Sequence, residues 1–189
     1  MPPLGRASQR VQGLRQASAR HDFVRIERSI VGADPVLGYV IAVGSQWTLL
    51  SAFSAGSPNG WILLRIADVT SVDVASEGRF VRRGLEFQRS WPARAPDTEL
   101  SLSGDVRALI ESAAEYFPLV TLYVENQHPG SFVVGRPIRW TLDRVGWQEL
   151  SPDAAWESEL TMYELAQITR VDVGGQYATA LARIADLRG

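Results

Sequence analysis

The sequence RIADVTSVDV at residues 65–74 returns as ELAQITRVDV at residues 164–173. Ala, Thr, Val, Asp and Val recur in register, and Ile66/Leu165 and Val69/Ile168 are conservative replacements. A stretch that recurs at a long interval within one chain is typical of an internal repeat. We therefore predict that the chain contains one structural unit in two tandem copies.

Other features recur at nearly the same interval. Gly38 is matched by Gly135, and Trp47 by Trp147. Four upstream residues return after 95 positions: Ser8, Val11, Leu14 and Ala19 match Ser103, Val106, Leu109 and Ala114. The interval changes only from 95 to 100 residues, as short loop insertions would produce. The alternative is two unrelated halves that share a β-rich composition.

Each copy begins with a predicted helix. In the second copy Ser103 is placed to cap the helix, and Asp105 lies in its first turn, where a carboxylate suits the helix dipole. Apolar residues then follow at helical spacing on one face: Val106, Leu109, Ile110, Ala113 and Phe117. In the first copy the stripe of Val11 and Leu14 is thin and Gly13 interrupts it, so we expect that helix to fray.

Short apolar runs separated by Gly, Pro, Asp, Asn and Ser follow each helix. Such runs, bounded by turn-forming residues, are typical of strands. The predicted strands are residues 22–27, 38–43, 47–53, 61–66 and 70–74 in the first copy, and 119–125, 132–142, 145–150, 160–165 and 169–173 in the second. Their regular spacing predicts a small, strongly bent sheet or partial barrel in each copy.

A further helix is predicted after Gly174 and Gly175, with a buried stripe of Tyr177, Leu181, Ile184 and Leu187/Arg188. Its counterpart at residues 80–87 is ambiguous between helix and strand. Residues 90–97 contain two prolines and no periodicity, so we interpret them as the linker between a first repeat, 1–95, and a second, 96–189. The predicted fold class is α+β, mainly β: two tandem copies of a helix plus a five-stranded, strongly bent antiparallel sheet, with a C-terminal helix.

A helix followed by five short strands resembles the Sm-like, SH3-related small barrel, here in tandem. The ending ITRVDV, a glycine pair and a helix is also similar to an uncharacterised type of bacterial protein. The Sm family reads RNA through an Asp/Asn-rich loop after its second strand and an Arg-Gly pair near its fourth. Here the loop reads GSQW at residues 44–47, and Arg65 precedes Ile66. The family's RNA pocket therefore transfers to no residue of this chain.

Composition limits the classes of protein. The chain has no cysteine and no apolar run near the ~18–20 residues of a membrane span, and Met1 opens no apolar leader, so we expect a cytoplasmic protein with no membrane partner. All nineteen basic residues are arginine, which indicates a GC-rich bacterium. Residues 1–95 carry twelve Arg and seven acids (+5), and residues 96–189 carry seven Arg and fourteen acids (−7). Opposite charges can orient one copy against another; the alternative is drift on solvated faces.

Motifs for catalysis, cofactors or metals are missing. There is no Gly-x-Ser-x-Gly elbow, no Walker loop and no Gly-x-Gly-x-x-Gly. His21 and His128 are interpreted as solvated loop residues, and two histidines without cysteines do not make a zinc site. The Gly174-Gly175 pair can present amides to an anion, but a tight turn explains it as well. We predict no catalytic, cofactor-binding or metal residue.

One stretch is a candidate binding patch, because arginines beside an aromatic ring can stack on nucleobases. It comprises Arg79, Arg82, Arg83, Arg89, Trp91 and Arg94; the alternative is a solvated charged stretch. Asp73 and Asp172 close the repeated segment at equivalent places. They are expected to accept backbone N–H groups of the next turn, the alternative being a paired carboxylate site.

Three functions remain open on the sequence. The first is a non-catalytic binding or assembly module that contacts a protein partner or itself. The second is nucleic-acid (RNA) binding through the patch at residues 79–94. The third is an enzyme with a site between the repeats, built from Asp73, Asp172, Arg65 and Arg170.

Overall fold

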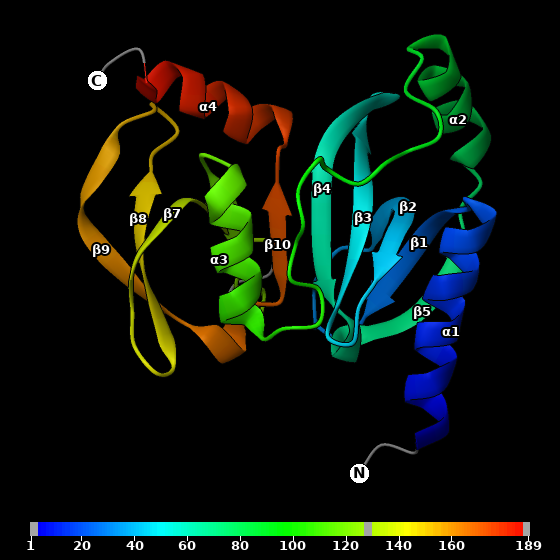
Figure 1. Ribbon diagram of the computed structural model, residues 1–189, viewed down its shortest axis with the longest axis horizontal. Coiled ribbons are helices and arrows are strands. Elements are labelled where there is room, and N and C mark those ends of the chain that lie inside the picture. The colour runs from blue at the N-terminus through cyan, green and yellow to red at the C-terminus, as the bar shows by residue number, and fades with distance from the viewer. Residues whose placement is uncertain (1–3, 127–129, 187–189) are drawn as a thin grey trace.

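The computed structural model describes residues 4–126 and 130–186 of the chain. The fold is α+β and mainly strands: within these residues four helices accompany one antiparallel sheet of ten strands, which does not close on itself (Figure 1). No helix of the described residues is long and apolar enough to span a membrane.

The first half of the chain forms two helices and five strands. They are α1 (Leu4–Arg20), β1 (Phe23–Arg28), β2 (Val36–Val43), β3 (Trp47–Ser54), β4 (Ser57–Arg65), β5 (Val69–Val74) and α2 (Gly78–Phe87). Gly13 does not interrupt α1. A Cβ at Gly13 would stand 3.7 Å from the Cβ of Val72 on β5, which is ordinary van der Waals contact. The ambiguous stretch at residues 80–87 is helical, with Val81 and Leu85 buried.

The second half repeats this number of elements. They are α3 (Val106–Tyr116), β6 (Val120–Tyr123), β7 (Phe132–Trp140), β8 (Arg144–Leu150), β9 (Trp156–Glu164), β10 (Arg170–Val173) and α4 (Gln176–Asp186). The cap of α3 is Asp105 rather than Ser103, because the Asp105 carboxylate accepts the Ala108 N–H at 2.9 Å.

The predicted buried stripe of α4 is confirmed for Leu181 and wrong for Tyr177 and Ile184. Tyr177 and Ile184 are exposed, and the buried residues are Ala178, Leu181, Ala182 and Ala185. These small side chains let α4 lie close to Leu119, Val134 and Leu150. Leu187 and Arg188 lie outside the described residues.

The two similar stretches adopt the same local structure. Residues Ile66–Asp68 and Leu165–Gln167 each form a short 3-10 turn. β5 follows its turn directly, and two residues separate β10 from its turn. In each turn a backbone N–H closes the ring, from Val69 to Ile66 and from Ile168 to Leu165. Trp47 and Trp147, by contrast, do not occupy equivalent positions in the sheet. Trp47 lies opposite Arg65. Glu164 is the residue aligned with Arg65, and it lies opposite Arg144 rather than Trp147.

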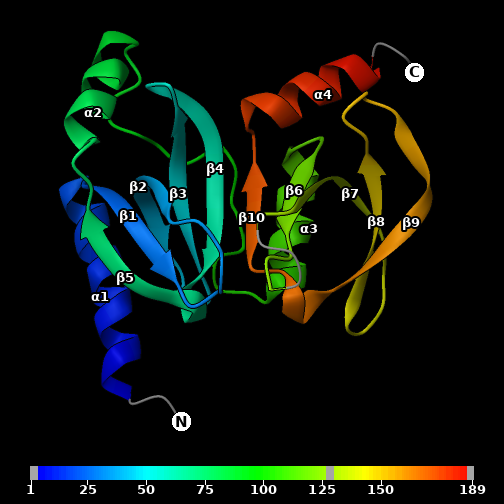
Figure 2. The same ribbon diagram turned by 180° about the vertical axis from the view of Figure 1, so that it is seen from behind.

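The sheet runs in the order β5-β1-β2-β3-β4-β10-β6-β7-β8-β9. Strand β10, late in the chain, therefore lies between β4 and β6 and joins the two halves, as both ribbon views show (Figures 1 and 2). The connection from α2 to α3 crosses the face of this joint (Figure 1).

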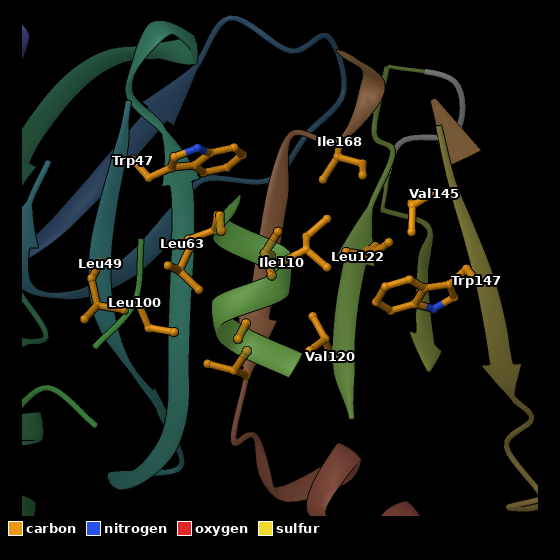
Figure 3. Packing of buried hydrophobic residues seen from close by; sticks show 14 of the residues in the cluster. Trp47, Leu49, Leu63, Leu100, Ile110, Val120, Leu122, Val145, Trp147 and Ile168 are labelled. Carbon is orange, nitrogen blue, oxygen red and sulfur yellow. The ribbon is translucent and has the colours of Figure 1, made fainter. Parts of the chain in front are cut away.

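One apolar cluster spans the joint. Trp47, Leu49 and Leu63 of β3 and β4 pack with side chains from α3, β6, β8 and β10 (Figure 3). A second cluster lies within the first half, under α1, and includes Leu14, Ile26 and Leu50. Because the larger cluster draws on both halves, the joint is part of the hydrophobic core rather than a surface contact.

Candidate functional site

The predicted arginine patch lies around α2 and the connection that follows it. Its six residues are Arg79, Arg82 and Arg83 on α2, then Arg89, Trp91 and Arg94; the arginines are exposed and Trp91 is partly buried. Arg79 and Arg82 border a hollow of about 530 Å³ beside His21 and Tyr39. Arg89 and Arg94 border another, of about 290 Å³. The structure thus gathers the patch at one end of the first half.

The Trp91 ring is already in contact with its neighbours. The Arg82 guanidinium carbon lies 4.8 Å from the ring centroid, and the rings of Tyr39 and His21 approach at 5.3 and 6.0 Å. The same connection is held where Trp61 donates its Nε1–H to the Arg94 carbonyl at 2.8 Å. A nucleobase would have to displace these contacts to stack on Trp91, so the ring has a packing role.

The four residues of the predicted inter-repeat site do not converge. Asp73 lies on β5 at one end of the sheet, and Asp172 lies on β10 with four strands between them. Asp73 accepts a hydrogen bond from the Ser71 hydroxyl at 2.8 Å, and Arg65 pairs with Asp68 at 2.8 Å. Asp73 and Asp172 were expected to accept backbone N–H groups of the next turn. In the structure both carboxylates accept hydrogen bonds from side chains instead.

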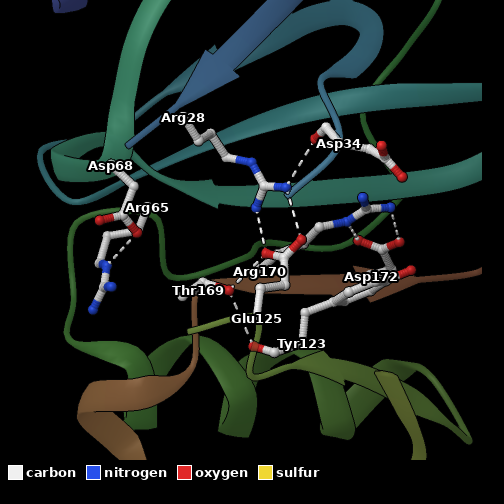
Figure 4. A network of polar contacts seen from close by, with 9 residues as sticks. All are labelled: Arg28, Asp34, Arg65, Asp68, Tyr123, Glu125, Thr169, Arg170 and Asp172. Carbon is white, nitrogen blue, oxygen red and sulfur yellow. Dashed lines mark hydrogen bonds and ion pairs between the residues drawn. The ribbon is translucent and has the colours of Figure 1, made fainter. Parts of the chain in front are cut away.

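A buried ion pair ties the two halves together at the joint (Figure 4). Arg28, at the end of β1, donates both Nη groups to the Glu125 carboxylate after β6, one of them at 2.8 Å. The side chains are 1% and 3% exposed. The Thr169 hydroxyl donates to the same carboxylate at 2.7 Å. A charge this deeply buried is tolerated because it is paired and hydrogen-bonded.

A second polar group lies beside it on β10. Arg170 donates its Nε–H to Asp172 at 2.7 Å and also pairs through Nη2. The guanidinium carbon lies 4.2 Å from the centroid of the Tyr123 ring. Arg170, Asp172 and Tyr123 line an open cleft of about 270 Å³, whose walls include Phe132 and Tyr177. The cleft lies at the joint, but its charged side chains, Arg170 and Asp172, are paired with each other rather than directed into the cleft.

Burial and pairing shift the acidities of these groups in opposite directions. Burial alone would raise the pKa of Glu125, but hydrogen bonds from Arg28 and Thr169 outweigh it and hold that pKa below its usual value. Burial raises the pKa of Asp172 despite the opposing charge of Arg170. Burial and the Asp172 charge raise the pKa of the Tyr123 phenol. Glu125 is therefore ionised at neutral pH and stabilises the fold in that form.

The lowered pKa of Glu125 predicts an acid-sensitive joint. The stabilising contribution is present above the usual carboxyl pKa of about 4.3 and is lost as the pH falls through the lower folded value. Between about pH 5 and pH 3 we expect the free energy of unfolding of the wild type to fall more than that of Glu125→Gln. Glu27→Gln is the control, because Glu27 is 42% exposed. Equal pH slopes for wild type and Glu125→Gln, measured by urea unfolding, would contradict this assignment.

The strand joint itself is regular and reinforced at both ends. β4 and β10 pair antiparallel, with Leu63 opposite Val171 and Trp61 opposite Val173. At one end of the joint, Arg65 donates to the Ala166 carbonyl at 3.0 Å. At the other end, two bonds run between the start of α4 and β4: Asn59 Oδ1 accepts the Gln176 N–H at 2.9 Å, and the Pro58 carbonyl accepts from Gln176 Nε2 at 3.1 Å. Gly174 turns the chain between strand and helix at φ +65°, which supports the tight-turn interpretation of the glycine pair.

The two ends of the sheet are open. Within residues 4–126 and 130–186, β5 pairs only with β1, and β9 pairs only with β8. β5 exposes Val74 (72%), and Val72 is half-buried beside it. On β9, Leu160 and Met162 are half-buried, and Glu157 and Glu159 are exposed. An open strand edge presents unpaired backbone groups to another chain.

His21 lies at the arginine patch, where it borders the hollow beside Arg79 and Arg82. His21 is exposed at φ 52° in the turn after α1, and its ring meets Trp91 edge-on. His128 lies outside the described residues. Among the residues that are described, no group of three or more His, Cys, Asp or Glu side chains is placed to hold a metal ion.

The structure shows an ion pair at the joint that the sequence did not indicate. Arg28 and Glu125 lie 97 positions apart, and nothing local distinguishes Arg28 from the exposed Arg25. Glu125 ends a predicted strand in the same way as Glu27, yet Glu27 is half-exposed and Glu125 is buried.

Comparison with protein-family models, with curated proteins and with solved structures finds no match to this chain.

Proposed function

We propose that the protein is a cytoplasmic binding or assembly module without catalytic activity, whose contacts are made by the edges of its sheet. Two tandem repeats of a helix and a five-stranded, strongly bent sheet account for the strand order: β5-β1-β2-β3-β4 is followed by β10-β6-β7-β8-β9. If each five-strand block is one repeat, the second has the order of the first. This order, with a helix before each block, is compatible with an Sm-like small barrel in each repeat.

The observation that carries the proposal is the β4–β10 joint. If each half is one repeat, this joint pairs the fourth strand of the first repeat with the fifth strand of the second. The two strands are paired at four residue positions, and an apolar cluster spans the joint. A fold that joins two of its own units in this way has edges suited to protein contacts. The same two kinds of edge, β5 and β9, are open at the ends of the sheet.

The charges at the joint support a structural rather than a catalytic role. Arg28 pairs with Glu125, and Arg170 pairs with Asp172, so each guanidinium is matched with a carboxylate of the joint. A catalytic group needs a reacting atom within its reach. Here the carboxylates and the guanidinium groups bind each other. This favours a role in which they hold the two halves in register.

Nucleic-acid binding through the arginine patch is less favoured. The ring that would stack on a base, Trp91, is engaged by Arg82, Tyr39 and His21. Arg82 is also paired with Glu86 at 2.8 Å. The whole chain has a formal net charge of −2, and nucleic-acid-binding domains are usually strongly basic.

Light scattering after size exclusion tests the proposal. We expect a mass above that of one chain, 20.8 kDa, in about 0.1 M salt, and a lower mass in about 1 M salt, where the Debye length shrinks to about 3 Å. A particle of one chain in both buffers, with no partner retained in a pull-down from the native host, would overturn the assembly function.

A further inference from the structure

We infer that the hollow bordered by Arg89 and Arg94 is a binding site for a small aromatic carboxylate. It has a volume of about 290 Å³ and lies where the chain leaves α2 and passes β4 (Figure 1). Small-molecule sites have volumes of about 300–1,000 Å³, so this hollow suits a small ligand of about one or two rings. Its lining residues come from neither β5 nor β9, so the site is separate from the open edges of the sheet.

The base of the hollow is apolar and belongs to the packed interior of the first half. Leu85, which lines it, is 1% exposed. Phe53 and Trp91 also line it, and both pack against the buried cluster that contains Leu85. Trp61 supplies a further ring. A ligand ring can therefore be buried against aromatic surfaces here, and it fills the hollow without displacing the neighbours of Trp91.

The two arginines at the hollow are available to an anion. Arg89 and Arg94 are exposed, and no ion pair between described residues engages either side chain. The described residues that line the hollow include no acid. Arg82, by contrast, is already paired with Glu86 at 2.8 Å. A guanidinium binds a carboxylate through two parallel hydrogen bonds, so this charge selects an anion over a neutral ligand.

Arg89 has a backbone conformation in which glycine is usual. Its φ is 56°, in the turn that ends α2. The Ser90 N–H donates to the Leu85 carbonyl at 2.8 Å, and the Arg89 N–H donates to the Glu86 carbonyl at 3.1 Å. This is the pattern of a helix end whose left-handed residue is most often glycine. A left-handed residue with a side chain costs conformational energy, and such residues gather at binding sites. Binding of an anion gives a reason for an arginine at this position.

Hydrogen bonds fix the chain on each side of the two arginines. Gln88 donates from Nε2 to the Ser57 hydroxyl at 3.0 Å, which ties the end of α2 to the start of β4. Trp61 donates its Nε1–H to the Arg94 carbonyl at 2.8 Å, which ties the following segment to the same strand. A site whose backbone is already in place loses less conformational freedom when a ligand binds.

Arg89→Gly tests the site, because its effects on folding and on binding have opposite signs. Glycine suits the left-handed turn, so the urea midpoint of this variant should lie above that of the wild type. Loss of the guanidinium should raise the dissociation constants for benzoate and naphthoate about tenfold. Arg94→Ala should weaken binding by a similar factor, since it removes the second guanidinium and leaves the Arg94 carbonyl bonded to Trp61. Isothermal titration calorimetry measures the affinities.

The controls separate charge at the hollow from charge elsewhere on α2. Arg83 is exposed on α2 and is not among the residues that line the hollow. Arg83→Ala removes the same charge and should leave the affinity for benzoate within about twofold of the wild type. Benzamide has nearly the shape of benzoate without its charge, and acetate has the charge without the ring. Each should bind about tenfold more weakly than benzoate.

Three results would overturn the site. The first is a wild type that binds neither aromatic carboxylate at up to about 10 mM. The second is equal affinity for benzoate and benzamide. The third is equal weakening by Arg83→Ala and Arg89→Gly, which would indicate a diffuse cationic surface for a polyanion such as RNA. If Arg89→Gly instead lowers the urea midpoint, Arg94→Ala decides: weaker binding at an unchanged midpoint supports the site, and unchanged binding overturns it. Assembly is measured separately by light scattering.

Discussion

Arg28→Ala is expected to lower the free energy of unfolding by about 3–5 kcal/mol, because it leaves the Glu125 carboxylate buried without its cation. Glu125 is 3% exposed, and after the substitution only the Thr169 hydroxyl would remain as a side-chain donor. Arg28 also donates to the Asp34 carbonyl at 3.1 Å, so the loop after β1 loses a contact as well. Urea unfolding followed by tryptophan fluorescence measures the change.

The matched control is Arg25→Ala, three residues earlier on the same strand. The Arg25–Glu27 pair is 2.9 Å long but about half exposed, so its loss should cost about 0–1 kcal/mol. Arg28→Met/Glu125→Leu should recover most of the loss, because replacing both members of a buried pair by apolar groups is often neutral. If Arg28→Ala costs no more than Arg25→Ala, the ion pair does not hold the two halves together.

Gly60→Ala should be the most damaging single-methyl change at the joint. Gly60 has φ +74°, a conformation that costs a residue with a Cβ about 1–3 kcal/mol. A Cβ there would also stand 2.3 Å from the Val173 carbonyl oxygen and 2.5 Å from the Gly175 nitrogen, both backbone atoms. Overpacking of this kind adds about 1–3 kcal/mol. We expect a total loss of about 2–6 kcal/mol in the free energy of unfolding.

Gly130→Ala separates the two causes. Gly130 has nearly the same angle, φ +75°, but nothing lies within 4 Å of its Cβ position. It should therefore show only the conformational cost, and Gly60→Ala should exceed it by about 1–3 kcal/mol. Equal losses for the two substitutions would mean that β4 and β10 are not closely apposed at Gly60.

The order of elements could be predicted from the sequence because it depends on local patterns. Alternating apolar runs and turn residues placed all ten strands. The two 3-10 turns were not predicted, and the last residues of the predicted strands 61–66 and 160–165 lie in them. Local patterns failed where packing decided the outcome. Ala178 and Ala182 are buried on α4 instead of the larger Tyr177, because the helix approaches Leu119 and Leu150 closely.

The joint could not be predicted, because it depends on contacts between distant parts of the chain. Nothing in residues 57–65 indicates that β4 pairs with a strand more than one hundred positions later. The Arg28–Glu125 pair has the same cause, since only the joint brings β1 and β6 to one place. The predicted patch failed as a stacking site for a related reason: Trp91 is engaged by Tyr39 of β2, which its neighbours in sequence do not reveal.

The central claim is that the protein makes its contacts through the open edges of its sheet, and sedimentation velocity of edge variants tests it most directly. Val74→Glu places a carboxylate on β5, and Leu160→Glu/Met162→Glu places two on β9, where charges oppose pairing with another strand. In low salt the wild type should sediment as a particle of more than one chain, and the variant with all three substitutions should sediment as one chain. Leu142→Glu is the control and should sediment as the wild type does, because Leu142 is 99% exposed in the turn between β7 and β8. A triple variant that assembles as the wild type does would contradict the claim.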